Sequence, residues 1–152
     1  SLRVGSVFYY LCAIMDLFAR KIIAYKISRH IDTKLALDTL DAAVAVRGCS
    51  NGIIFHTDRG CQFTSLRFRK HLEMLGMIQS FSKKGHPYDN AVMECFFKFL
   101  KREETNRHSY ASLDALEHSL FAYINGFYNS LRPHSSNGGL SPNEHEHLFF
   151  LS

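Results

Sequence analysis

Two acidic residues lie at positions that suit metal-dependent chemistry. Asp58 follows an apolar segment of residues 53–56, and Glu94 lies near the start of a segment with helical periodicity. Ligand sites gather at the ends of strands in α/β sheets, and paired carboxylates are hard oxygen donors that suit Mg²⁺ or Mn²⁺. Such ions could hold the attacking and leaving oxygens of a phosphoryl displacement. The competing interpretation is structural, because an Asp after a strand often closes a turn and a helical Glu is often only solvated.

Cationic residues follow Glu94 at helical spacing. Lys98 and Lys101 lie four and seven residues after it, so the three share one helical face, which Arg102 borders. Positive charge beside a metal carboxylate suits a phosphate backbone drawn into the site. The alternative for Lys98 is an ordinary surface pair with Glu94.

Four further residues are candidates for DNA contact. Arg59 could contact phosphate or neutralise the carboxylates, and Lys83 and Lys84 belong to a polar loop with a glycine, which predicts mobility. Asn90 could contact a base or a sugar, or help to cap the helix of Glu94. By contrast, His56 is expected to pack in the core rather than to bind a metal.

Composition and charge narrow the class of protein. The 152 residues are 46% hydrophobic, which predicts one globular domain, and the net charge of +4 favours a polyanionic partner. The cysteines are too scattered for a zinc pattern, and no apolar run approaches the roughly 18 residues that cross a bilayer. We therefore expect neither a structural zinc ion nor a membrane partner.

Periodicity predicts the elements that must position the candidate residues. An N-cap at Asp32 and a stop at Gly76 bound two of the helices. The expected elements are a hairpin of strands 7–15 and 20–28, a helix from 33 to 47, a strand at 53–56, a helix at 65–75, a strand at 77–81, helices at about 90–103 and 113–128, and an irregular tail at about 132–152. Strands alternating with helices predict an α/β fold with a mixed sheet.

Several motifs resemble those of a known family. Residues 56–65, HTDRGCQFTS, are similar to the second-aspartate motif of insertion-sequence transposases of the IS3 type, and residues 85–97 resemble their glutamate motif. Between Asp58 and Glu94 lie 35 residues, the spacing that gives the D,D(35)E family its name. Further matches at 16–23, 127–135 and 140–142 extend the resemblance over nearly the whole chain.

The resemblance implies a single integrase or transposase catalytic core over residues 1–152, with an RNase H-like mixed β-sheet flanked by helices. It implies that Asp58 and Glu94 are catalytic metal ligands for Mg²⁺ or Mn²⁺, and that the helix of Glu94 holds DNA ends. The implied function is DNA cleavage and strand transfer in transposition, by a homo-oligomer associated with the bacterial nucleoid in the cytoplasm. No small-molecule substrate is expected.

One departure from the family pattern affects the expected activity. The first catalytic Asp of the family lies in a pattern like Asp-x-Thr-Tyr, and residues 2–5 resemble the end of that first strand and the turn after it. We therefore expect a truncated first strand, an inactive chain, and a sheet edge that favours self-association. Asp16 is expected to cap a turn rather than to replace the missing ligand. Two alternatives remain open: a non-catalytic fragment that binds DNA or self-associates, and an RNase H-like nuclease without strand transfer.

Overall fold

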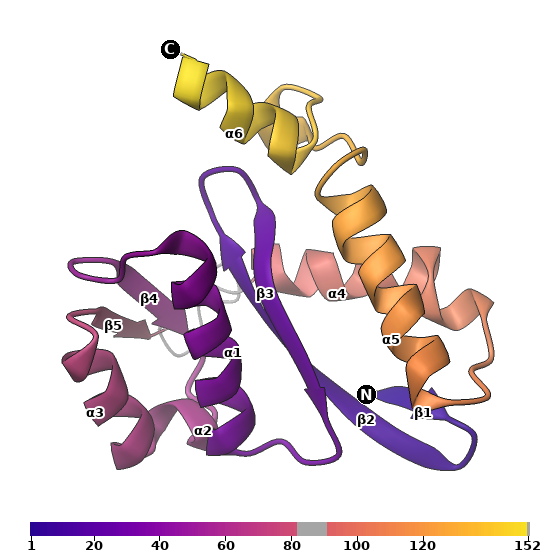
Figure 1. Ribbon diagram of the computed structural model, residues 1–152, viewed down its shortest axis with the longest axis horizontal. Coiled ribbons are helices and arrows are strands. Elements are labelled where there is room, and N and C mark those ends of the chain that lie inside the picture. The colour runs from indigo at the N-terminus through magenta and orange to yellow at the C-terminus, as the bar shows by residue number, and fades with distance from the viewer. Residues whose placement is uncertain (82–90, 152) are drawn as a thin grey trace.

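The computed structural model describes residues 1–81 and 91–151 (Figure 1). The strands are β1 (Leu2–Val4), β2 (Val7–Asp16), β3 (Lys21–Ser28), β4 (Ile54–Thr57) and β5 (Ile78–Phe81). The helices are α1 (Thr33–Arg47), α2 (Cys61–Thr64), α3 (Leu66–Met74), α4 (Ala91–Glu103), α5 (Leu113–Phe121) and α6 (Pro142–Leu151), with 3-10 turns η2 (Thr105–Arg107) and η4 (Ser135–Asn137) and a π-helix η3 (Ala122–Tyr128).

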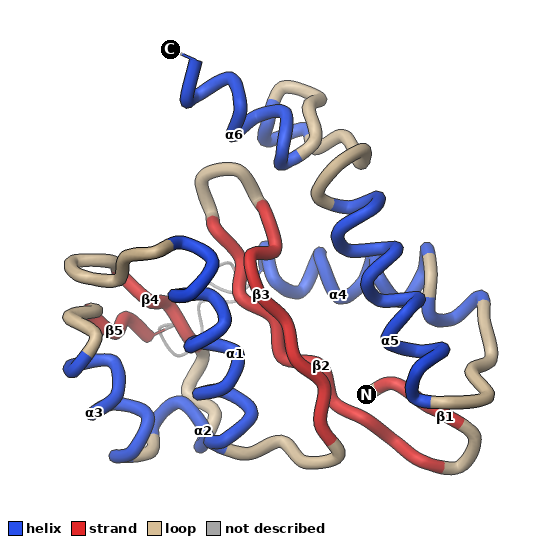
Figure 2. Tube along the Cα trace, viewed as in Figure 1, coloured by secondary structure: helices blue, strands red, loops and turns tan. Residues whose placement is uncertain are grey.

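The strands form two sheets within the described residues (Figure 2). β1, β2 and β3 are antiparallel neighbours, and β4 pairs with β5 in parallel. The predicted hairpin is confirmed, and residues 2–4 form the end of a strand that is followed by a turn, as expected. Gly5 adopts a left-handed φ of 58°, which lets Val4 turn back and pair with Val7.

Helices cover both faces of the hairpin because β2 is apolar on both sides. Tyr9, Leu11, Ala13 and Met15 pack toward a core built from α4, α5 and η3. Ile14 points the other way, into a second cluster formed by α1 and α3. This alternation follows from the two-residue period of a strand, and it places α4, the helix of Glu94, directly against the three-stranded sheet.

Local capping signals set α1 as predicted. The Asp32 carboxylate accepts a hydrogen bond from the Leu35 amide at 2.9 Å, and Gly48 ends the helix with a φ of 76°. Past the end of α3, Gly76 also has a left-handed φ, of 72°. These helices end where the sequence placed their ends.

The helix predicted over 113–128 changes its character midway. α5 ends at Phe121, and the chain continues as the π-helix η3, with the Asn129 amide donating to the Ile124 carbonyl at 2.9 Å. The Asn129 side chain then accepts from the Ile22 amide at 3.0 Å and donates to the Ile22 carbonyl at 2.9 Å. These long-range bonds fasten the helix to β3, which periodicity alone could not predict.

The expectation of an irregular tail over 132–152 is wrong from Pro142 onward, where α6 begins. A reciprocal capping box explains the helix, because the Ser141 hydroxyl accepts from the Glu144 amide and the Glu144 carboxylate accepts from the Ser141 amide, both at 3.3 Å. Proline at the first helical position adds to this signal.

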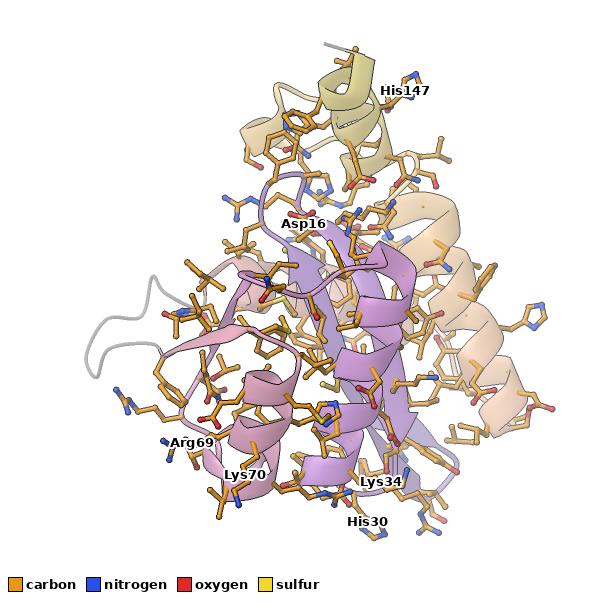
Figure 3. All side chains as sticks on the ribbon, turned by 60° about the vertical axis from the view of Figure 1, so that its left-hand side comes forward. Asp16, His30, Lys34, Arg69, Lys70 and His147 are labelled. Carbon is orange, nitrogen blue, oxygen red and sulfur yellow. The ribbon has the colours of Figure 1, made fainter. Side chains whose placement is uncertain are left out.

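Asp16 serves the hairpin turn and the attachment of α6. Its Oδ1 accepts from the Phe18 amide at 2.9 Å, and its Oδ2 pairs with Arg47 at 2.8 Å. Arg47 also pairs with Glu146 of α6 at 2.9 Å. In Figure 3 Asp16 lies at the hairpin end, beneath α6. The prediction that Asp16 caps a turn is confirmed.

Candidate metal and nucleic-acid site

Asp58 lies at the point where the chain leaves β4. The strand is held by its parallel pairing with β5, and the exposed Asp58 side chain follows at once. Asp58 Oδ1 accepts a hydrogen bond from the Gly60 amide at 2.7 Å. No donor in the described part of the chain reaches Oδ2, so the turn orients the carboxylate and leaves one oxygen open to solvent.

Gly60 leaves the space that this carboxylate occupies. A Cβ on Gly60 would lie 2.9 Å from Asp58 Oδ1 and 2.9 Å from Gln62 Oε1, inside normal contact. The backbone there, with φ of −59° and ψ of 147°, is accessible to any residue. The absence of a side chain at residue 60 therefore matters for the position of Asp58 rather than for the shape of the turn.

Glu94 is exposed on the first turn of α4, whose other face is anchored in the core. Phe96 and Leu100 are 0% and 1% exposed, and the Phe96 ring contacts the Tyr128 ring edge-on at 5.1 Å between centroids. Burial of such side chains contributes roughly 1.5–3 kcal/mol each. This packing fixes the rotation of α4 and keeps Glu94 at the surface.

A charged cluster holds the other end of α4. Arg132 donates to both carboxylate oxygens of Glu103, at 3.0 and 2.9 Å, and lies 3.9 Å from the centroid of the Phe99 ring. Tyr123 donates to the same carboxylate at 2.6 Å. The bonds from Arg132 are the main reason that the pKa of Glu103 is lowered, whereas burial, and then its bond to Glu103, raise the pKa of Tyr123.

Buried rings continue this cluster toward the sheet. Burial raises the pKa of Tyr128 to about 12. His134 packs edge-on against the Tyr128 ring at 4.7 Å, and burial, followed by the charge of Arg132, lowers the pKa of His134. Arg132 and His134 therefore both have structural contacts. Local sequence patterns could not predict this cluster, because Glu103 lies far along the chain from Tyr123 and Arg132.

The cations of α4 differ in their surroundings. Lys98 and Lys101 are exposed, and no described ion pair joins Lys98 to Glu94, so the ordinary surface pair is not formed. Lys101 lies near the start of β1, where its charge adds to burial in lowering the pKa of the Ser1 amino group. The Arg102 guanidinium lies 5.3 Å from the Phe99 ring centroid, toward the Glu103 cluster.

The remaining candidates have separate outcomes. Arg59 lies 5.1 Å from the Phe81 ring centroid, which joins the Asp58 turn to the end of β5. His56 is exposed and lies 3.1 Å from the Ser80 hydroxyl, so the expectation that it packs in the core is wrong. It lies on the open face of a two-stranded sheet, which sequence alone could not show. Lys83, Lys84 and Asn90 lie outside the described residues.

The arrangement of β4, β5 and α4 determines how Asp58 and Glu94 lie relative to each other. Figure 1 shows the ends of β4 and β5 turned toward the end of α4 that carries Glu94. Within residues 1–81 and 91–151 no three His, Cys, Asp or Glu side chains form a cluster that could hold a metal ion. Asp58 and Glu94 still fit a hard divalent cation by donor type, because both are exposed carboxylates carried by anchored elements.

Comparison with known proteins identifies the family. Residues 2–87 match the integrase core domain family, and residues 75–142 match a second description of the integrase core domain. The chain belongs to the integrase core domain family. Its integrase core is 39% identical over 137 residues to the transposase for insertion sequence element IS904 of Lactococcus lactis, covering 90% of this chain and 54% of that protein. It is 37% identical over 145 residues to transposase InsF for insertion sequence IS3A of Escherichia coli, covering 95% and 50%.

Solved structures show the same fold at lower identity. The integrase core matches the HTLV-2 integrase catalytic core domain in complex with magnesium, in its dimeric form, with a TM-score of 0.60 and 16% identity over 95% of this chain and 88% of that one. It matches a simian T-cell lymphotropic virus intasome in complex with PP2A regulatory subunit B56 gamma with a TM-score of 0.73, covering 95% and 50%. The predicted RNase H-like α/β fold is confirmed.

Two further facts concern the length of the relatives and the helices of this chain. The chain spans about half the length of the curated relatives it matches. In the described parts of this integrase core, no helix is long and apolar enough to span a membrane.

Proposed function

We propose that this integrase core is the catalytic part of a transposase that cuts and joins DNA strands in the bacterial cytoplasm. The single observation that carries the proposal is the pair of exposed carboxylates, Asp58 and Glu94, on anchored elements of an integrase core domain. Neither carboxylate forms an ion pair within residues 1–81 and 91–151, so both are open to a cation.

Asp58 and Glu94 would hold Mg²⁺ or Mn²⁺. When bound, the metal would supply charge stabilisation for the attacking and leaving oxygens of a phosphodiester. The chain's own part is to fix the carboxylates: the Gly60 amide orients Asp58, and the buried Phe96 and Leu100 hold the α4 rotation that exposes Glu94. A magnesium complex of the HTLV-2 core is known, which supports this choice of cation.

The DNA backbone would lie along the exposed cations beside these carboxylates. Lys98 and Lys101 follow Glu94 on one face of α4, and Arg102 extends this basic surface toward Phe99. Arg59 adds a positive charge next to Asp58. Lys83, Lys84 and Asn90 are proposed DNA contacts on the sequence pattern alone. Phosphate contacts of this kind position a duplex without reading its sequence.

We expect these 152 residues alone to be inactive, so a transposition assay tests the proposal in cells that carry the whole element encoding this chain. Asp58→Asn and Glu94→Gln should each reduce the transposition frequency below detection, because each removes a charged metal ligand while nearly preserving shape. Asp38→Asn is the matched control, since Asp38 is an exposed carboxylate on α1 whose surface pair with Lys34 contributes little. Normal transposition by either site variant would overturn the proposal.

Self-association is a second part of the proposal. Related cores are described in dimeric and trimeric forms, and one in an intasome. On this chain Phe121 is 60% exposed beside a cavity of about 560 Å³ between β3 and α5. Aromatic side chains are enriched at protein interfaces, so Phe121 is the position that we test. Light scattering at high concentration should give a mass above that of the monomer, and Phe121→Ser should lower it. A monomeric mass for the unaltered chain would contradict self-association.

A further inference from the structure

A second cluster of exposed cations lies on α3, away from the basic face of α4. Arg67, Arg69 and Lys70 are exposed, and Glu73 is the one acidic residue of the helix. Figure 3 shows Arg69 and Lys70 pointing outward from α3. None of the three cations forms an ion pair or ring contact in the described part of the chain. Elsewhere Lys34, Arg47 and Arg132 each pair with a carboxylate.

The position of α3 relative to Asp58 is fixed by a continuous series of contacts. The Gly60 amide binds Asp58, and the Gly60 carbonyl then accepts from the Phe63 amide at 2.9 Å, which starts α2. The Phe63 ring packs edge-on against Phe68 of α3 at 5.4 Å, and Gln79 of β5 donates to the Phe63 carbonyl at 2.8 Å. α3 is thus a rigid extension of the Asp58 turn rather than an independent surface helix.

Packing also determines which side of α3 faces outward. Phe68 and Leu72 are 0% and 1% exposed and point into the cluster shared with α1. Arg67 and Lys70, three residues apart, are neighbours on the outer surface, with Cβ atoms about 5–6 Å apart. The nine residues of α3 extend the helix about 13 Å at 1.5 Å per residue, comparable to about four base steps of 3.4 Å.

We propose that Arg67, Arg69 and Lys70 form a second DNA-backbone surface, which holds the duplex into which strands are joined. The proposal rests on the proposed function, because a strand-joining enzyme must hold two DNA molecules at one pair of carboxylates. α4 offers cations on the Glu94 side, and α3 offers them on the Asp58 side. The exposed polar side chains of α3 are charged, and Arg and Lys side chains bind the phosphate backbone. Such a surface binds phosphates of any sequence, as a target duplex requires.

Binding of a fluorescent random-sequence duplex, followed by anisotropy in EDTA, tests this surface without any reaction. The variant is Arg67→Gln/Lys70→Gln, and the control is Arg3→Gln/Arg29→Gln, which removes the same charge from exposed positions on β1 and just after β3. The salt slope is the decrease of log K with log[salt], and each lost phosphate contact should reduce it by about 0.9. Two lost contacts therefore mean that raising salt from about 50 to about 200 mM weakens binding by the α3 variant roughly 12-fold less than it weakens binding by the unaltered chain. The control should keep the slope of the unaltered chain.

The outcomes separate this inference from the proposed function. An α3 variant that keeps the salt slope, or an unaltered chain that does not bind the duplex, overturns the inference whatever Asp58→Asn does to transposition. Equal displacement of the duplex by poly-glutamate of the same charge would also overturn it, in favour of an acidic protein partner. A reduced salt slope in the α3 variant supports the DNA-backbone surface even if Asp58→Asn transposes normally. Normal transposition by Asp58→Asn would overturn only the proposed catalytic function.

Discussion

Gly60→Ala should weaken metal binding while leaving the fold intact. The new Cβ would lie 2.9 Å from Asp58 Oδ1, whereas ordinary contact begins at 3.4 Å, so the carboxylate must move by 3.4 − 2.9 = 0.5 Å. Metal–ligand distances are defined to within about 0.2 Å. A shift of this size therefore exceeds the tolerance of a ligand, although it is small for a solvent-exposed side chain.

The expected loss of metal affinity is about 10–100-fold, the range seen when partners that orient a ligand are removed. Stability should not fall, because Ala can adopt the φ of −59° at residue 60 and restricts the unfolded chain, which favours the folded state by about 0.4–1 kcal/mol. Isothermal titration of Mg²⁺ gives the affinity, and thermal unfolding without metal gives the stability.

Gly126→Ala is the matched control for this substitution. A Cβ on Gly126 meets no atom within 4 Å, so the same chemical change occurs without displacing a neighbour. The control should bind Mg²⁺ as the unaltered chain does. If Gly60→Ala also bound Mg²⁺ with unaltered affinity, Asp58 could not be a ligand in the conformation described, and the reasoning from its turn would be refuted.

Three further predictions concern the anchoring of α4 and α6. Phe96→Ala should lower the free energy of unfolding by about 3–5 kcal/mol in urea titrations, because it empties a fully buried site; a loss below 1 kcal/mol would contradict the packing described. The lowered pKa of Glu103, caused first by Arg132, stabilises the fold above the carboxyl's unfolded pKa of about 4.3, and this contribution should be lost as pH falls through the folded pKa. Glu103→Gln should therefore flatten the acid limb of stability against pH, and an unchanged limb would exclude this source. Ser141→Ala should cost the start of α6 about 1 kcal/mol by losing the bond to Glu144, seen as faster amide exchange confined to that helix; unchanged exchange would argue against the cap.

The parts of the fold that sequence predicted are those with local causes. Asp32 and Gly48 bound α1 because caps act within a few residues of the helix they end. The hairpin followed from a continuous apolar strand and its turn. α6 was also predictable in principle, since Ser141 and Glu144 have capping-box spacing, but the apolar pattern after Pro142 was too short to suggest a helix.

The parts that sequence missed depend on contacts between distant residues. The Asn129 side chain binds the backbone of Ile22, which is distant in the sequence. Arg132 contacts Glu103 and Phe99, which are also distant in the sequence. No periodicity encodes such pairs. For the site, residue types and the strand and helix ends of Asp58 and Glu94 could be predicted, whereas the role of Gly60 and the outward face of α3 required the folded chain.

The central claim is that Asp58 and Glu94 bind a divalent metal ion together, and a Mn²⁺ titration followed by electron paramagnetic resonance tests it most directly. The signal of free Mn²⁺ should decrease on addition of the unaltered chain and of Asp38→Asn. It should decrease much less with Asp58→Asn or with Glu94→Gln. The double variant should bind Mn²⁺ as weakly as the weaker-binding of the two single variants, and no more weakly, because both residues belong to one site. Equal Mn²⁺ binding by all of these chains, or none by the unaltered chain, would contradict the claim.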